Sequence, residues 1–68
     1  MREKWYFTFG ISHFHAKDYV VLLGDVETTR QRMHELFGNG WSMQYNKEQF
    51  EKIQKKWNYK ILYAELLL

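Results

Sequence analysis

The N-terminal segment alternates aromatic and other side chains, and this alternation constrains the fold more than any other feature of the chain. Positions 5, 7, 9 and 11 are Trp, Phe, Phe and Ile, while positions 6, 8 and 10 are Tyr, Thr and Gly. A two-residue period is typical of a half-buried β-strand, because successive side chains of a strand point to opposite faces of its sheet. We therefore predict a strand whose odd-numbered residues face the core.

Three further segments have the character of strands. Residues 19–23 form a nearly continuous apolar run, which is typical of a central strand covered on both faces, and residues 12–18 connect it to the first strand. Residues 41–46 alternate again, which predicts one apolar face made by Trp41, Met43 and Tyr45. Residues 59–66 favour a fourth strand, with a helix running on from Lys47 to the end as the alternative.

Two helices are predicted from their capping residues. Asp25 is placed as the N-cap of the first helix, and Gly38 as the residue that ends it. Asn46 is placed as the N-cap of the second helix, with Gln49 in the capping-box position. The apolar positions of the two helices are Val26, Met33, Leu36 and Phe37 in the first and Phe50, Ile53 and Trp57 in the second.

Together these elements predict one α+β domain over residues 1–68. The expected order is β-β-α-β-α-β, with an antiparallel or mixed sheet of three to four strands and both helices on one face. The chain has no cysteine, which excludes disulfides, thiolate metal sites and a thiol nucleophile. No apolar run approaches the roughly 20 residues of a membrane-spanning helix, and the N-terminus does not have the pattern of a signal peptide, so we expect a cytoplasmic protein without a membrane partner.

The opening Trp-Tyr-Phe-Thr-Phe-Gly at residues 5–10, with Gly24, the Met33 to Gly38 segment and the Trp41 to Tyr45 run, resembles a family of small uncharacterised bacteriophage and prophage proteins. The resemblance extends from residue 5 to about residue 46. It implies a viral accessory protein that acts in the bacterial cytoplasm. Small proteins of that kind often bind and inhibit a host enzyme or a defence system, which makes an anti-CRISPR role one candidate.

No group of residues predicts catalysis or a cofactor. His13 and His15 could chelate one metal ion from an extended backbone, but no third and fourth ligands are evident. Ser12, His13 and Asp18 share one short connection, which cannot hold a nucleophile, a base and oxyanion donors in mutual reach. We therefore expect a protein that is not an enzyme and has no catalytic, cofactor or metal site.

The expected function is binding. The leading hypothesis is a phage-type inhibitor that docks on a host or phage protein, for example a CRISPR-type defence nuclease, and blocks or redirects it. The alternative is an RNA- or DNA-binding protein, because four of the five basic residues beyond residue 40 cluster on or just after the second helix. A homodimer is a third hypothesis. The candidate partner-binding residues are Tyr6, His13, Phe14, His15, Ser42 and Gln44, and the candidate nucleic-acid contacts are Lys52, Lys55, Lys56 and Lys60.

Overall fold

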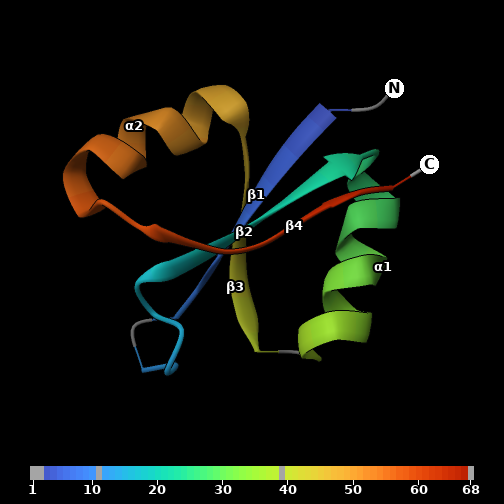
Figure 1. Cartoon of the computed structure of the whole chain (residues 1–68), viewed down its shortest axis with the longest axis horizontal. Helices are drawn as coiled ribbons and strands as arrows, with labels where there is room; N and C mark the ends of the chain where they lie inside the picture. Colours follow the sequence, from blue (N-terminus) through green and yellow to red (C-terminus); the bar gives the residue numbers. More distant parts are fainter. Residues whose placement is uncertain (1–2, 11, 39, 68) are drawn as a thin grey trace.

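The computed structural model describes residues 3–10, 12–38 and 40–67, and it confirms an α+β fold with the expected element order. The described part of the chain measures 30 × 25 × 15 Å along its principal axes (Figure 1). Its strands and helices are β1 (Glu3–Phe9), β2 (Asp18–Gly24), α1 (Val26–Phe37), β3 (Trp41–Asn46), α2 (Lys47–Trp57) and β4 (Lys60–Leu66).

The four strands form one mixed sheet in the order β3-β1-β2-β4. β1 pairs antiparallel with both β2 and β3, whereas β4 runs parallel to β2. The tail is therefore a strand, and the alternative of a helix running from Lys47 to the end is wrong. β4 finds its partner within its own chain, and β2 is a central strand, as its continuous apolar run predicts.

The two helices lie on opposite faces of the sheet, so the prediction that both cover one face is wrong. Phe9 of β1 packs edge-on against Phe37 of α1, with ring centroids 5.3 Å apart. Tyr6 of the same strand stacks on Phe50 of α2 at 4.5 Å. Because Tyr6 and Phe9 differ in parity along one strand, their side chains point to different faces. Figure 1 shows α1 and α2 on the two sides of the strands. Both faces of β1 carry rings large enough to require cover.

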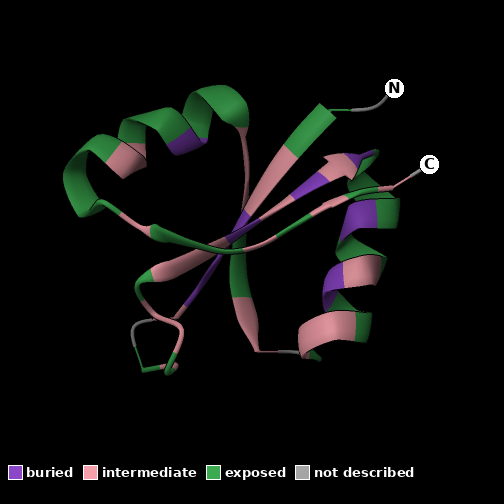
Figure 2. Ribbon diagram, in the orientation of Figure 1, coloured by how far each residue is buried: buried purple, intermediate pink, exposed green. Residues whose placement is uncertain are grey.

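The larger core lies between the sheet and α1. Thr29 of α1 is fully buried in the first turn, and its Oγ1 lies 2.8 Å from the carbonyl oxygen of Asp25. Val26, which the sequence predicts in the core, is exposed, and Thr29 is the buried residue in this part of the helix. Figure 2 shows buried residues concentrated on β1, β2 and α1. The buried apolar side chains of this core are Phe7, Phe9, Val20, Leu22 and Met33.

A β-bulge in β3 changes the expected face of one aromatic residue. Thr8 of β1 pairs with Met43, but the next residue, Phe9, pairs with Trp41, so Ser42 is an extra residue in β3. A bulge of this kind interrupts the alternation of side chains. Trp41 consequently packs edge-on against Phe7 on the α1 face, with centroids 5.2 Å apart. Met43 and Tyr45 belong to the other face, so the prediction that all three share one apolar face is wrong.

The second face is covered by α2 through an aromatic cluster. Phe50 is the buried residue of α2, and it contacts the rings of Tyr6, Tyr19 and Tyr59 at 4.5, 4.7 and 6.1 Å. The predicted capping box is confirmed: the Gln49 N–H donates to Asn46 Oδ1 (2.8 Å), and the Asn46 N–H donates to Gln49 Oε1 (3.0 Å). α2 therefore starts at a fixed point directly after β3.

Candidate functional site

The connection between β1 and β2 folds into consecutive tight turns at one end of the sheet. The His13 N–H donates to the Gly10 carbonyl (2.9 Å), the Ala16 N–H to the His13 carbonyl (3.0 Å), and the Asp18 N–H to the His15 carbonyl (2.9 Å). Backbone groups that bond to one another in this way give a connection a defined shape. The side chains of this segment are therefore held in place although it lies outside the strands.

Phe14 is the most exposed large apolar side chain of the described residues, at 86%. Its ring stacks on His13 at 4.8 Å and is tilted against His15 at 4.1 Å. His13 in turn stacks on Phe9, a residue of the core, at 4.9 Å. An exposed ring that rests on a column of rings rising from the core is supported on one side and free on the other. That arrangement presents Phe14 for contact with another molecule.

The two histidines of the connection do not converge on a common point. His13 Nδ1 accepts a hydrogen bond from the His15 N–H (3.1 Å), and a Cβ placed on Gly40 would lie 2.9 Å from His13 Nε2. His15 Nδ1 lies 2.9 Å from Asp18 Oδ2. The rings are stacked with centroids 5.5 Å apart. The chelating geometry considered for His13 and His15 is therefore not formed, and the rings serve to shape the connection.

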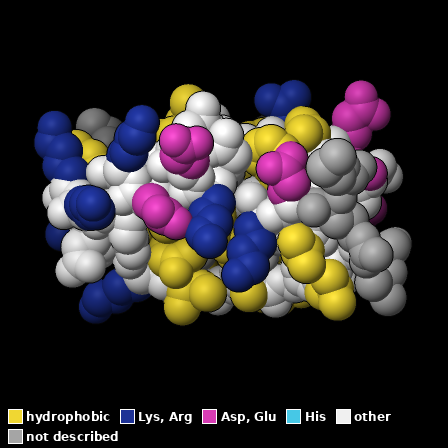
Figure 3. Space-filling model, turned by 90° about the horizontal axis from the view of Figure 1, so that it is seen from above, with side chains coloured by type: hydrophobic (Ala, Val, Ile, Leu, Met, Phe, Trp, Pro, Cys, Tyr) yellow, Lys and Arg dark blue, Asp and Glu magenta, His cyan; other side chains and the backbone are white. Residues whose placement is uncertain are grey.

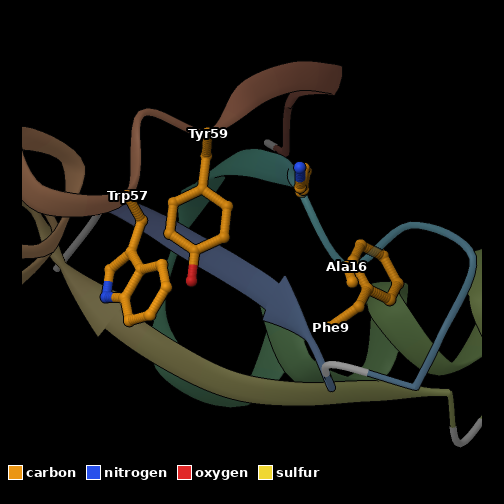
Figure 4. A pocket seen from close by; sticks show the side chains of 5 residues that line it. Phe9, Ala16, Trp57 and Tyr59 are labelled. Carbon is orange, nitrogen blue, oxygen red and sulfur yellow. The ribbon is translucent and has the colours of Figure 1, made fainter.

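The turn between α2 and β4 is fixed by a hydrogen-bonded side chain. Asn58 ends α2 in the left-handed conformation, with φ 54° and ψ 55°, which Asn adopts more readily than most residues. The side-chain amide of Gln54 then makes two hydrogen bonds to the backbone of Tyr59, the residue after Asn58. Its Nε2 donates to the Tyr59 carbonyl (2.9 Å), and its Oε1 accepts from the Tyr59 N–H (2.7 Å). This turn fixes the backbone of Tyr59 just after Trp57 (Figure 4).

A pocket of about 240 Å³ lies between this turn and the β1–β2 connection. Figure 4 shows Trp57 and Tyr59 on one side and Phe9 and Ala16 on the other. Trp57 is 63% exposed, so the prediction that it belongs to the core stripe of α2 is wrong: α2 extends past the part of the sheet that it covers. Phe14 does not line the pocket, but it lies in the same β1–β2 connection as Ala16 and Lys17, which do. We call the pocket together with Phe14 the groove end, made by Phe9, Phe14, Ala16, Lys17, Trp57 and Tyr59.

Lysines surround the groove end. Lys17 lines the pocket, and the Lys60 N–H donates to the Lys17 carbonyl (2.9 Å). Lys56 Nζ lies 5.9 Å from the centroid of the Trp57 ring, within cation–π range. The left end of the molecule in Figure 3 carries Lys and Arg side chains, whereas Asp and Glu lie farther along. This end of the molecule is therefore basic although the formal charge of the whole chain is only +2.

The ion pairs of the described part of the chain are His15–Asp18, Arg32–Glu35 and Arg32–Glu65. None of them involves Lys17, Lys56 or Lys60. Two of the candidate nucleic-acid contacts, Lys52 and Lys55, are exposed on α2 and likewise have no carboxylate within 4.0 Å. Their charges are therefore available to a partner rather than neutralised within the fold.

Burial raises the pKa of Tyr59 above its ordinary value, and the nearby Tyr45 raises it further. The phenol is therefore neutral at physiological pH. A neutral hydroxyl can both donate and accept a hydrogen bond. The described walls of the groove end consequently include positive charge from Lys17, one phenol and largely apolar surface.

This chain matches no family model, no curated protein and no solved structure. Among residues 3–10, 12–38 and 40–67, no helix is long and apolar enough to cross a membrane. In the same part of the chain, no three His, Asp or Glu side chains come together in a group that could hold a metal ion. The shape and chemistry of the groove end are thus the basis for a functional assignment.

The predicted partner-binding residues do not form one surface. Tyr6 is half-buried against α2, and Gln44 lies on the other face, where its Nε2 donates to Thr29 Oγ1 of α1 (3.3 Å). Ser42 is exposed at the bulge in β3. Of the six candidates, only Phe14 is part of the groove end. The rings of His13 and His15, in the same connection, pack against the ring of Phe14.

The candidate residues chosen from the sequence do not include Trp57, Tyr59 or Lys17. The helical period places Trp57 on the same stripe as Phe50, and a period cannot show where the underlying sheet stops. Tyr59 and Lys17 lie next to each other only because β4 runs beside β2. The one usable signal was local: an aromatic residue on each side of Asn58, a residue that readily ends a helix.

Proposed function

We propose that this protein is a non-enzymatic binding module that docks on a macromolecular partner through its groove end. The observation that carries the proposal is the position of two exposed aromatic side chains. Phe14 and Trp57, 86% and 63% exposed, come from the two segments that border one pocket. Large exposed rings on segments that border a pocket are typical of interfaces rather than of ordinary surface.

The construction of the groove end supports this function. Phe14 rests on His13 and His15, and the turn after Trp57 is fixed by the side chain of Gln54. Aromatic residues that are already held in place lose little conformational entropy on binding. Residues of this type, next to a pocket, often contribute most of the affinity of an interface.

A binding module of this kind agrees with the resemblance to phage accessory proteins. We propose that it acts in the bacterial cytoplasm, where it blocks or redirects a host macromolecule. The sharpest version of the hypothesis is inhibition of a defence nuclease.

The test is an affinity enrichment from host lysate with the tagged protein and matched variants, in parallel with and without nuclease treatment. Trp57→Ala and Phe14→Ala should each lower recovery of the specific partner at least tenfold, as truncation of an interface anchor does. Leu66→Ala is the matched control, because Leu66 is also exposed, at 56%, but lies at the opposite end of β4. It should leave recovery unchanged.

Melting curves of the same variants separate binding from folding. All three substitutions remove exposed side chains, so we expect each to change the free energy of unfolding by no more than about 0.5 kcal/mol. A partner that is retained equally by wild type, Trp57→Ala and Phe14→Ala would contradict the proposal. Loss of the partner on nuclease treatment would instead support the nucleic-acid alternative.

A further inference from the structure

The geometry points to an acidic protein segment as the partner of the groove end, with one aliphatic or aromatic side chain inserted between Trp57 and Phe9. This inference rests on the proposed function and narrows it to one class of ligand. It combines two features, an apolar pocket and unpaired lysines at its border, which are argued separately.

The pocket fits a single apolar side chain. Its volume of about 240 Å³ lies below the range of roughly 300–1,000 Å³ that holds a drug-sized ligand. Its walls are the rings of Phe9, Trp57 and Tyr59 with the methyl group of Ala16. A leucine or phenylalanine side chain buried there exchanges water for hydrocarbon contact on several sides. Such an anchor is the usual centre of a peptide interface.

The border of the pocket selects for negative charge. Lys17 lines it, Lys56 Nζ lies 5.9 Å from the Trp57 ring centroid, and Lys60 directly follows Tyr59. All three lysines are exposed, and none has a carboxylate partner among the described residues. Asp18, the acidic residue next to Lys17, is already bonded to His15 Nδ1 at 2.9 Å. Carboxylates that flank an inserted anchor would find complementary charges on both sides of the groove, which speeds association and favours acidic partners.

The same features disfavour a nucleobase in the pocket. The edge of every base carries several donors and acceptors, and burying them without partners costs free energy. Apart from Lys17, the side-chain polar groups of the pocket are the Tyr59 hydroxyl and the Trp57 N–H. An apolar amino-acid side chain leaves no such groups unpaired. We therefore make single-stranded nucleic acid an outcome of the test rather than the proposal.

The experiment uses the full chain and three blocked heptapeptides in nuclear magnetic resonance titrations. The first peptide has one leucine between two runs of three aspartates, the second has glycine in place of leucine, and the third has lysines in place of the aspartates. We expect the first peptide to shift the Trp57 indole N–H and the amides of Ala16 and Lys17. The glycine and lysine peptides should bind at least tenfold more weakly.

Variants of the protein separate the contribution of the apolar pocket to peptide binding from that of the lysines. Trp57→Ala should weaken the first peptide at least tenfold, whereas Lys17→Gln and Lys60→Gln should each weaken it about two- to fivefold and reduce its dependence on salt. Lys47→Gln, at the far end of α2, is the matched control and should have no effect.

Three results would overturn the inference: equal binding of the glycine peptide, equal binding of the lysine peptide, or no shift at the pocket. Saturable binding of a thymidine oligonucleotide to the same residues, with none of the peptide, would assign the site to nucleic acid. If no peptide binds but the lysate partner is still lost in Trp57→Ala, the inference fails while the proposed function stands.

Discussion

At the scale of single residues, Arg32 connects a helix to an edge strand through its ion pair with Glu65. Arg32 Nε and Nη2 donate to the two carboxylate oxygens of Glu65 at 2.6 and 3.1 Å, and Nη1 donates to Glu35 at 3.0 Å. The hydrogen bonds from Arg32 hold the pKa of Glu65 below its ordinary value. A carboxyl group whose pKa is lowered by folding stabilises the fold while it is ionised. This contribution is present above the unfolded-state pKa of about 4.3 and is lost as the pH falls through the native pKa.

Glu65→Gln should therefore have a lower melting temperature than wild type at pH 7. The difference should shrink as the pH falls below about 4, because the wild-type carboxyl group then becomes neutral as well. Melting curves by circular dichroism between pH 2.5 and 7 provide the measurement. Glu51→Gln is the control, since Glu51 has no ion pair among the described residues. A constant difference across this pH range would show that the ion pair does not account for the effect.

At the scale of elements, the bulge in β3 decides which face Trp41 occupies. Deleting Ser42 makes Trp41 and Met43 neighbours in the chain, and neighbouring residues of a regular strand point to opposite faces, so both keep their pairing with β1 and their present faces. We therefore expect the deletion variant to unfold cooperatively, with Trp41 still in the α1 core. Ser42→Ala keeps the bulge and should stay within about 0.5 kcal/mol of the wild-type free energy of unfolding. Near-ultraviolet circular dichroism reports the packing of Trp41, and loss of the wild-type spectrum in the deletion variant would contradict this account.

At the scale of the whole molecule, β4 closes the sheet on the side of β2. Tyr63 and Leu67 pack against the α1 core, and Leu67 N–H donates to the Leu23 carbonyl at 2.9 Å. A domain of about 60 residues buries only about 60% of the surface of its unfolded chain, so its margin of stability is small. A chain that ends at Asn58 should lack a cooperative transition in circular dichroism. The double variant Ile61→Ala with Leu66→Ala changes only exposed side chains and should melt close to wild type. A truncated chain that melts like wild type would show that β4 is not part of the folding unit.

Much of the fold follows from local signals in the sequence. The capping residues Asp25 and Asn46 and the helix end at Gly38 appear where the sequence predicts them. The first strand, predicted from the alternation of residues 5–11, spans Glu3–Phe9, and residue 11 lies outside the described residues. Each depends on neighbouring residues: the two-residue alternation of a strand, a side chain that accepts from the first turn, or a glycine at φ 65°. The element order and the α+β class follow from these signals together.

The candidate site could be predicted only in part, and the reason is distance along the chain. Phe14 stood out because it lies in a segment without regular alternation, and such segments reach the surface. The groove itself needs Lys17 beside Lys60 and Trp57 across from Phe9, pairs that only the parallel register of β4 brings together.

The sequence by itself determined the α+β class, the order of the elements and the residues Asp25, Gly38 and Asn46 that cap the helices, since these signals depend on residues within a few positions of one another. The tertiary structure alone decided that the helices take opposite faces, that Trp41 turns into the α1 core and that Trp57 lies outside the core. Each of these results depends on which strand lies next to which and where the sheet stops. Those are properties of contacts between distant residues, and the period of a single segment does not contain them.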